Sequence, residues 1–287
     1  MQLSPWAIVA LSATSYGLIL RSIVSPEPSP LKLRATIRGL SATHSIVTTI
    51  LALYVLRHAN WSSPKELRHE RPARISKPES QNAIEKPSSA TYLDDTYNPL
   101  IADHSSLANT ITSFETGYLI YDTSALLYSS YLQNSRRSIP RTPLYLAKDS
   151  PVFLAHHLAL ISALAYLQTY IAARREKGIW VIIAFLLMNA SNPLLHARWF
   201  VRRKTGRADN RLDAAFAVVF ALCRVGMIRW VLRRYGEYHG LSAWGAYKRL
   251  RVPCKTGVAA LVGFNGLWWV LLVAKITERG FGKRQKI

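Results

Sequence analysis

Cysteine is scarce in this chain: only Cys223 and Cys254 occur among 287 residues. Two thiols cannot form the disulfide framework that stabilises small secreted domains, and they cannot supply a four-cysteine zinc site. Cys223 lies inside an apolar run, where a thiol commonly serves as a small packing residue. The sequence therefore predicts a fold that depends neither on disulfides nor on a structural metal.

Acidic residues are also scarce, with 16 Asp and Glu against 37 Lys and Arg and a formal net charge of +21. Such a basic excess first suggests a nucleic-acid partner. The basic residues, however, gather at the ends of apolar runs, as in Arg202-Arg203-Lys204 and Arg233-Arg234. This placement suits the anionic headgroups of a membrane surface better than a nucleic-acid backbone. We therefore expect membrane lipids, and no nucleic acid, as partners.

Long apolar runs are abundant, although the mean hydropathy is only +0.07 because charged loops separate them. About 20 mostly apolar residues suffice to cross a membrane as a helix. The first run follows no basic region and no clear cleavage site, so we interpret it as a retained helix. The sequence predicts an all-α, multi-pass transmembrane bundle of about seven helices with a polar central cavity. The predicted helices cover Leu3–Leu20, Ile37–Leu56, Ile111–Leu132, Pro151–Ala172, Ile179–Phe200, Ala214–Leu232 and Thr256–Ile276.

Three parts follow from this pattern: an N-terminal helix and linker (1–36), a membrane domain (37–276) and a basic tail (277–287). Within the membrane domain, Asn60–Thr110 is rich in Pro, Ser and charge, so it cannot bury enough apolar surface to order itself. We predict that it is mostly disordered. Gly236–Pro253 is a shorter loop whose aromatic and basic residues suit a membrane interface. Seven crossings place the termini on opposite sides, and the Lys and Arg of the short loops favour a cytosolic C-terminus.

Two adjacent histidines, His156 and His157, lie within the apolar run Pro151–Ala172. Ionisable side chains are costly in hydrocarbon and usually face the bundle interior. An imidazole can act as a general base, and a carboxylate such as Asp122 could orient it. Neighbouring residues on a helix point about 100° apart, so the two rings do not suit one metal ion. His157 shares a face with Gln168, and we expect it to be the ring closer to the cavity.

Other predicted helices carry polar side chains at helical spacing, and lipid would leave these groups unsatisfied, so they should point at one another. Hydrogen bonding between helices is the simpler role for any one of them, and Arg224 could pair with Asp122 or Asp213. No metal ligands are predicted. The candidate catalytic residues are His157, His156 and Asp122, and the candidate substrate-binding residues are Tyr118, Tyr121, Asn189, Asn192, His196, Arg224, Gln168 and His44.

Four features in this order resemble the TLC domain, and most closely its small TLC-domain subgroup. They are Gly117-Tyr-Leu-Ile-Tyr-Asp122, the His156-His157 pair, Ser191-Asn-Pro-Leu-Leu-His-Ala-Arg-Trp199 and Arg224 within an apolar helix. The resemblance extends over about Ile37 to Ile276. This family groups ceramide synthases, TRAM proteins of the translocon and small proteins of lipid homeostasis. The resemblance implies a multi-pass bundle, most simply in the endoplasmic reticulum.

The ceramide synthases of this family transfer an acyl chain from acyl-CoA to a sphingoid amine, and use the histidine pair together with downstream paired aspartates. His156 and His157 match that pattern, but the next aspartate is Asp209. Many small members have a glutamate near the position of Asn189. The departures argue against ceramide synthesis, whereas the histidines and Asp122 favour some lipid chemistry.

Two functions of different classes remain open. The first is lipid acyl transfer, with a histidine as base and acyl-CoA as co-substrate but no bound cofactor. The second is a non-catalytic lipid-binding, sensing or trafficking role, in which the same residues hold a headgroup. Assistance to protein translocation is a third and weaker interpretation. The sequence does not indicate an oligomeric state.

Overall fold

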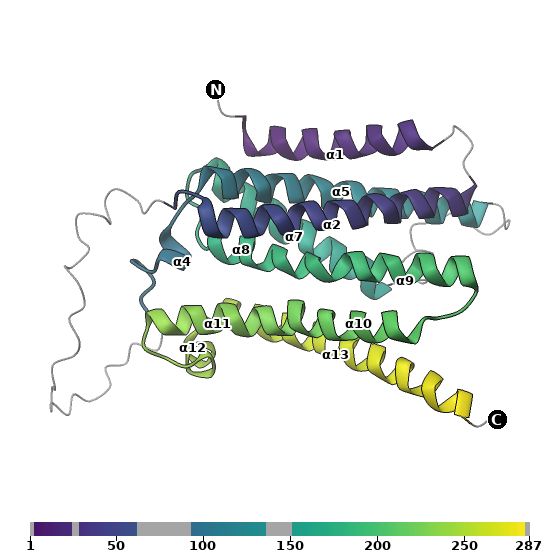
Figure 1. Cartoon of the computed structure of the whole chain (residues 1–287). Coiled ribbons are helices and arrows are strands. Elements are labelled where there is room, and N and C mark those ends of the chain that lie inside the picture. Colours follow the sequence, from purple (N-terminus) through teal and green to yellow (C-terminus); the bar gives the residue numbers. More distant parts are fainter. Residues whose placement is uncertain (1–2, 25–28, 62–92, 136–150, 285–287) are drawn as a thin grey trace, which may run out of the picture.

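A computed structural model describes residues 3–24, 29–61, 93–135 and 151–284. The described chain is helical throughout, and its long helices run side by side as one antiparallel bundle (Figure 1). Two of the long helical segments contain a local change of helix type. The long segments are α1 (Pro5–Ile23), α2 (Pro30–His58), α5 (Ser106–Ser135), α7 (Pro151–Ala172), α8–η1–α9 (Ile179–Leu186, Leu187–Ser191, Asn192–Thr205), α10–η2–α11 (Asn210–Phe220, Ala221–Gly226, Met227–Tyr238) and α13 (Val252–Arg284).

These seven segments confirm the predicted multi-pass helical bundle, and the N- and C-terminal ends lie at opposite ends of it (Figure 1). Among the described residues, five helices are long and apolar enough to cross a membrane: Pro5–Ile23, Pro30–His58, Ile179–Thr205, Asn210–Tyr238 and Val252–Arg279. The segments α5 and α7 are not among these five. They still lie alongside the others in the bundle (Figure 1).

Local sequence explains where several helices begin. Ser4 and Ser29 each accept a hydrogen bond from a backbone N–H of the first turn, and a proline follows each of them. Proline is favoured there because its missing N–H would have no helical partner, and its fixed φ suits the first turn. Asn98 caps the short α4 (Pro99–Ala102) in the same way.

The predicted disordered segment Asn60–Thr110 extends too far at its C-terminal end. Residues 62–92 lie outside the described part of the chain, but α4 and the first turn of α5 fall inside the segment. Helical order there has a local cause, because Ser105 accepts a hydrogen bond from the N–H of Ala108 and begins α5. The predicted loop Gly236–Pro253 likewise contains a short helix, α12 (Ala243–Arg249), with Trp244 stacked on Tyr247.

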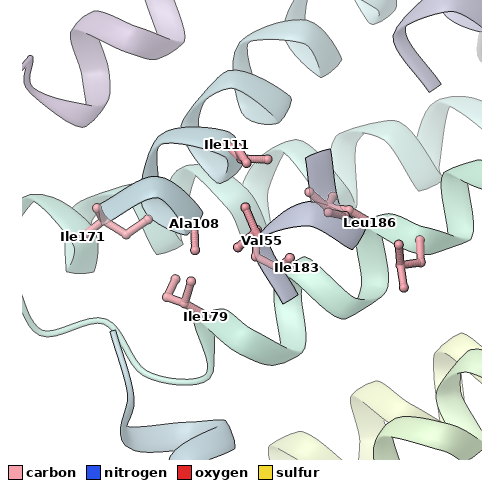
Figure 2. Packing of buried hydrophobic residues seen from close by; sticks show 9 residues of the cluster. Val55, Ala108, Ile111, Ile171, Ile179, Ile183 and Leu186 are labelled. Carbon is pink, nitrogen blue, oxygen red and sulfur yellow. The ribbon is translucent and has the colours of Figure 1, made fainter. Parts of the chain in front are cut away.

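Two clusters of buried apolar side chains lie at different positions along the bundle. One joins the end of α2, the start of α5, the end of α7 and α8; Figure 2 shows it. Its buried members are Ala52, Val55, Ala108, Ile111, Ile171, Ile179, Ile183, Leu186 and Leu187. The other joins the start of α2 to the middle of α5 and contains Leu33, Ile37, Tyr118, Tyr121 and Ala125.

Helix α1 packs closely on α5 at Gly117. A Cβ atom at this position would lie 2.3 Å from the backbone oxygen of Val9 and 2.7 Å from Cβ of Ser12. Backbone cannot move aside as the end of a flexible side chain can. The glycine therefore sets how closely the two helices approach.

We expect Gly117→Val to separate α1 from α5 and to lower the free energy of unfolding by about 2 kcal/mol, as for overpacked cores. Thermal unfolding of the detergent-solubilised protein, followed by tryptophan fluorescence, would measure this loss. Gly39→Val is the matched control, because a Cβ there has nothing within 4 Å. The same fall in melting temperature for both variants would contradict the packing argument.

Candidate functional site

A polar layer lies between the two apolar clusters. Along α2, the buried polar side chains fall between Ile37 of one cluster and Ala52 of the other. Along α5, the corresponding group falls between Ile111 and Tyr118. The predicted convergence of polar stripes therefore occurs inside the bundle. The layer contains Ser41, His44, Ser45 and Thr48 from α2, and Thr112, Ser113, Glu115 and Thr116 from α5.

His44 and Glu115 form the central pair of this layer. Nε2 of His44 lies 2.9 Å from Oε2 of Glu115, and the two side chains are 1% and 11% exposed. On the other side of the ring, Nδ1 of His44 lies 2.7 Å from the hydroxyl of Tyr16 on α1. A neutral imidazole fits both contacts, because the Tyr16 hydroxyl donates to Nδ1 and the Nε2–H donates to the carboxylate. Tyr118 stacks on the His44 ring and holds its plane.

Asn189 and Asn192 extend the network towards the opposite side of the bundle. The amide of Asn189 donates to Oε1 of Glu115 at 3.1 Å and lies 3.2 Å from the Thr48 hydroxyl. Asn192 then donates to Oδ1 of Asn189 at 3.2 Å. Pro193 lacks the N–H that would complete an α-helical bond to residue 189, and the chain there forms the 3₁₀ turn η1. The break thus presents both asparagines to the layer.

Arg224 ends this chain of hydrogen bonds. It donates from Nη2 to Oδ1 of Asn192 at 3.0 Å, with longer contacts of 3.5 Å to Ser191 and to Asn265 on α13. None of the ion pairs between described residues includes Arg224, so the expected pairing with Asp122 or Asp213 does not occur. Arg224 lies in the π-helical turn η2, a local widening that recurs at functional sites.

Asp122 faces α2 rather than the histidine pair. Its Oδ1 accepts a hydrogen bond of 2.8 Å from the Ser41 hydroxyl, and the side chain is buried. The neighbouring Tyr121 is also buried, and its hydroxyl has no hydrogen-bond partner among the described residues. A buried polar atom without a partner is uncommon in a folded protein.

The structure assigns the two histidines different surroundings. His157 is 7% exposed, and its Nδ1 lies 2.8 Å from the hydroxyl of Thr123 on α5. His156 is more exposed and stacks on Phe264 of α13 at 5.3 Å between ring centroids. Phe264 precedes Asn265, which Arg224 contacts, so the His156 ring lies at the Arg224 end of the site. His157 is therefore the more buried ring, and its position closer to a cavity stays a prediction.

Two further predicted residues have distinct positions. Gln168 is completely buried and bonds to Ser113 and Thr116, so it faces α5 as His157 does. His196 lies on α9, and its buried Nδ1 has no hydrogen-bond partner in the described part of the chain. Together with the Tyr121 hydroxyl, this nitrogen is a second unused polar atom among the predicted substrate-binding residues.

The sequence alone did not identify Glu115, Thr123 and Asn265 as site residues. Glu115 had one signal, because it shares a helical face with Tyr118 and Asp122. It places a carboxylate against Asn189. No feature of the sequence pointed to Thr123 or Asn265, because an isolated Thr or Asn in a predicted membrane span usually hydrogen-bonds only to its own helix. Over the described ranges, no group of three His, Cys, Asp or Glu is arranged to hold a metal ion.

Comparison with protein-family models matches residues 34–274 to the TLC domain. The chain belongs to the TLC domain family. This match and the apolar helices together make it a multi-pass membrane protein of lipid metabolism or homeostasis. Comparisons with curated proteins and with solved structures give no match. Helix α1, which supplies Tyr16 to the polar layer, lies before the matched region.

Proposed function

We propose that this TLC-domain protein transfers an acyl chain to the amine or hydroxyl of a membrane lipid, with His157 as the general base. The observation that carries the proposal is the contact between Nδ1 of His157 and the Thr123 hydroxyl. The Thr123 hydroxyl donates its proton to the Leu119 carbonyl at 2.8 Å, so it accepts from Nδ1–H of His157. This bond places the lone pair of the neutral imidazole on Nε2, which is the nitrogen that acts as the base in this proposal.

In the proposed step, Nε2 of His157 takes a proton from the acceptor amine or hydroxyl. The acceptor attacks the carbonyl carbon of an acyl-CoA thioester, and the tetrahedral oxyanion collapses with cleavage of the carbon–sulfur bond. The imidazolium then returns its proton to the departing thiolate. The products are an amide or ester and free coenzyme A, and no oxidant or metal is consumed.

Arg224 is suited to bind the negative charge in this reaction. It is a cation inside a membrane-spanning segment that bonds to neutral groups, Asn192, Ser191 and Asn265. An anionic or strongly polar ligand group would compensate its charge. The unpartnered Tyr121 hydroxyl and His196 nitrogen are further contacts for the headgroup. A lipid-sized cavity among these residues stays a prediction, as does residence in the endoplasmic reticulum.

A non-catalytic lipid-binding role is the second candidate, and the position of Asp122 favours it. The carboxylate expected to orient the catalytic ring is instead bonded to Ser41. Glu115 is likewise engaged by His44 and Asn189. In this alternative the same polar layer holds a headgroup, and the histidines only bind it.

The test uses the purified protein in nanodiscs, with a labelled long-chain acyl-CoA and a panel of amine and hydroxyl lipids. We expect transfer by the wild type, loss of at least about 100-fold in His157→Ala, and a smaller loss of about tenfold in Thr123→Val, as typical for a base and the group that orients it. Thr49→Val is the matched control, because Thr49 makes the same bond to its own helix without touching a histidine.

Melting temperatures of all variants separate lost chemistry from lost folding. Full transfer by His157→Ala would show that this histidine is not the base. If the wild type transfers nothing to any acceptor but retains labelled lipid through purification, and Arg224→Gln loses that lipid, the non-catalytic role is the correct one.

A further inference from the structure

A second group of charges lies apart from the polar layer, around Asp213 of α10. Its carboxylate contacts three guanidinium groups: Arg198 at 2.5 Å, Arg202 at 2.8 Å and Arg279 at 3.0 Å. The Asp213 side chain is only 2% exposed. Two of these cations come from α9 and one from α13, so a single buried carboxylate gathers three helices at one point.

One carboxylate neutralises only one of the three cations. More basic side chains follow on the same α9–α10 turn. The acidic residue of this turn, Asp209, accepts hydrogen bonds from the backbone at the start of α10 and does not pair with these cations. The excess of positive charge is therefore not compensated within the described structure. The basic residues of the turn are Arg203, Lys204, Arg207 and Arg211, all exposed.

Part of this cluster is open to an external partner. Asp213 accepts one bond each from Arg202 and Arg279, and a guanidinium has five N–H donors. Their side chains are 37% and 30% exposed. Nε of Arg202 is buried and has no hydrogen-bond partner among the described residues. A shallow hollow on the α9–α10 turn is lined by Thr205, Arg207 and Arg211 together with Asp209.

The cluster also lies at a defined depth. The candidate span Ile179–Thr205 ends here and Asn210–Tyr238 begins here, while α13 passes the cluster at Arg279. In Figure 1 the α9–α10 turn and the C-terminal part of α13 lie at the same end of the bundle. The ends of membrane-spanning helices lie at the level of the lipid phosphates, where arginine side chains extend into the headgroup region.

We propose that Arg202, Arg279 and the basic α9–α10 turn bind the phosphate headgroup of an anionic phospholipid. Arg198 neutralises Asp213, and Asp213 in turn holds Arg202 and Arg279 close together. Their remaining donors form bidentate bonds to phosphate oxygens, which match the planar guanidinium. The apolar helix ends below the cluster lie beside the acyl chains. This binding requires no acyl transfer, so it is independent of the proposed function.

The experiment titrates detergent-solubilised full-length protein with dioctanoyl phosphatidic acid and follows tryptophan fluorescence and melting temperature. Dioctanoyl phosphatidylcholine is the zwitterionic comparison. We expect Arg202→Gln/Arg279→Gln to raise the apparent Kd for phosphatidic acid by about tenfold or more, since bonds to charged groups are lost. The control is Arg233→Gln/Arg234→Gln, which removes the same charge from exposed residues paired with Glu237. We expect this control to change the Kd less than about twofold.

Equal weakening in both double variants would overturn the proposal, because only net charge would then matter. Equal affinity for phosphatidylcholine would overturn it too. Displacement of phosphatidic acid by equimolar inorganic phosphate or coenzyme A would assign the cluster to a soluble phosphate rather than a lipid. Arg198 still pairs with Asp213 in the double variant, so we expect it to fold. If it does not, the single variant Arg279→Gln must weaken phosphatidic acid binding by at least about threefold, or the proposal fails.

Discussion

Glu115→Ala is expected to be among the most damaging single changes in the polar layer, lowering the free energy of unfolding by about 3 kcal/mol. The variant leaves Nε2 of His44 and the amide of Asn189 without their acceptor in a buried, low-dielectric position. Unpaired buried donors incur their full desolvation penalty. Chemical or thermal unfolding in detergent, followed by tryptophan fluorescence, would measure the loss.

The variant Glu115→Gln removes the negative charge of this side chain but keeps its shape and its capacity for hydrogen bonds. Its amide oxygen can still accept from Asn189, and its NH₂ can donate to His44 if the ring changes tautomer and Nδ1–H donates to Tyr16. We therefore expect a loss of less than about 1 kcal/mol. Similar losses for the alanine and glutamine variants would show that the negative charge, rather than the hydrogen bonds, stabilises this layer.

Asp213→Ala is the second change with a large expected effect. It removes the one carboxylate shared by Arg198, Arg202 and Arg279, and three cations then repel one another at a partly buried site. Removing one partner from a buried ion pair costs about 3–5 kcal/mol. We expect a fall of that size in the free energy of unfolding, and lower yield of folded protein from membranes.

Asp209→Ala is the matched control for this prediction. It removes the same charge only four residues earlier, but Asp209 is exposed and accepts hydrogen bonds from Arg211 N and Leu212 N at the start of α10. Loss of such a helix cap costs about 1 kcal/mol. Equal destabilisation by Asp209→Ala and Asp213→Ala would argue that the three arginines do not depend on Asp213.

The fold class could be predicted from the sequence, because the hydropathy that marks a membrane-spanning helix extends over a whole run of residues. A run of about 20 apolar residues has few alternatives to a membrane-spanning helix. The seven predicted segments correspond to the long helices, and helical spacing correctly placed Gln168 and His157 on one face. The polar stripes meet inside the bundle because lipid offers them no hydrogen bonds.

The sequence did not predict which side chains hydrogen-bond to one another across the bundle. Asp122 and Thr123 are neighbours on α5, so they point about 100° apart, one to Ser41 of α2 and the other to His157 of α7. Which of them meets the histidine depends on how α5 is rotated relative to its neighbours. Spacing within one helix carries no information about that rotation. For the same reason, the sequence did not predict the contact between Glu115 and Asn189.

The sequence also did not predict where the helices depart from regular α-helical geometry. A proline at position 193 permits an unbroken or a broken helix, because neighbouring helices can satisfy the freed carbonyl. The π-helical turn at Ala221–Gly226 contains no proline. Both irregularities lie where Asn189, Asn192 and Arg224 meet, so tertiary contacts in the site support them.

The position of α1 bears on where this protein can be cut. Family likeness begins at residue 34, yet the hydroxyl of Tyr16 completes the hydrogen bonding of His44, and Val9 and Ser12 fill the groove at Gly117. A fragment trimmed to the matched residues would leave that groove open to lipid and the imidazole nitrogen without its donor. The cooperative folding unit is therefore larger than the unit of family similarity, and domain exchange between relatives should transfer α1 together with α2 and α5.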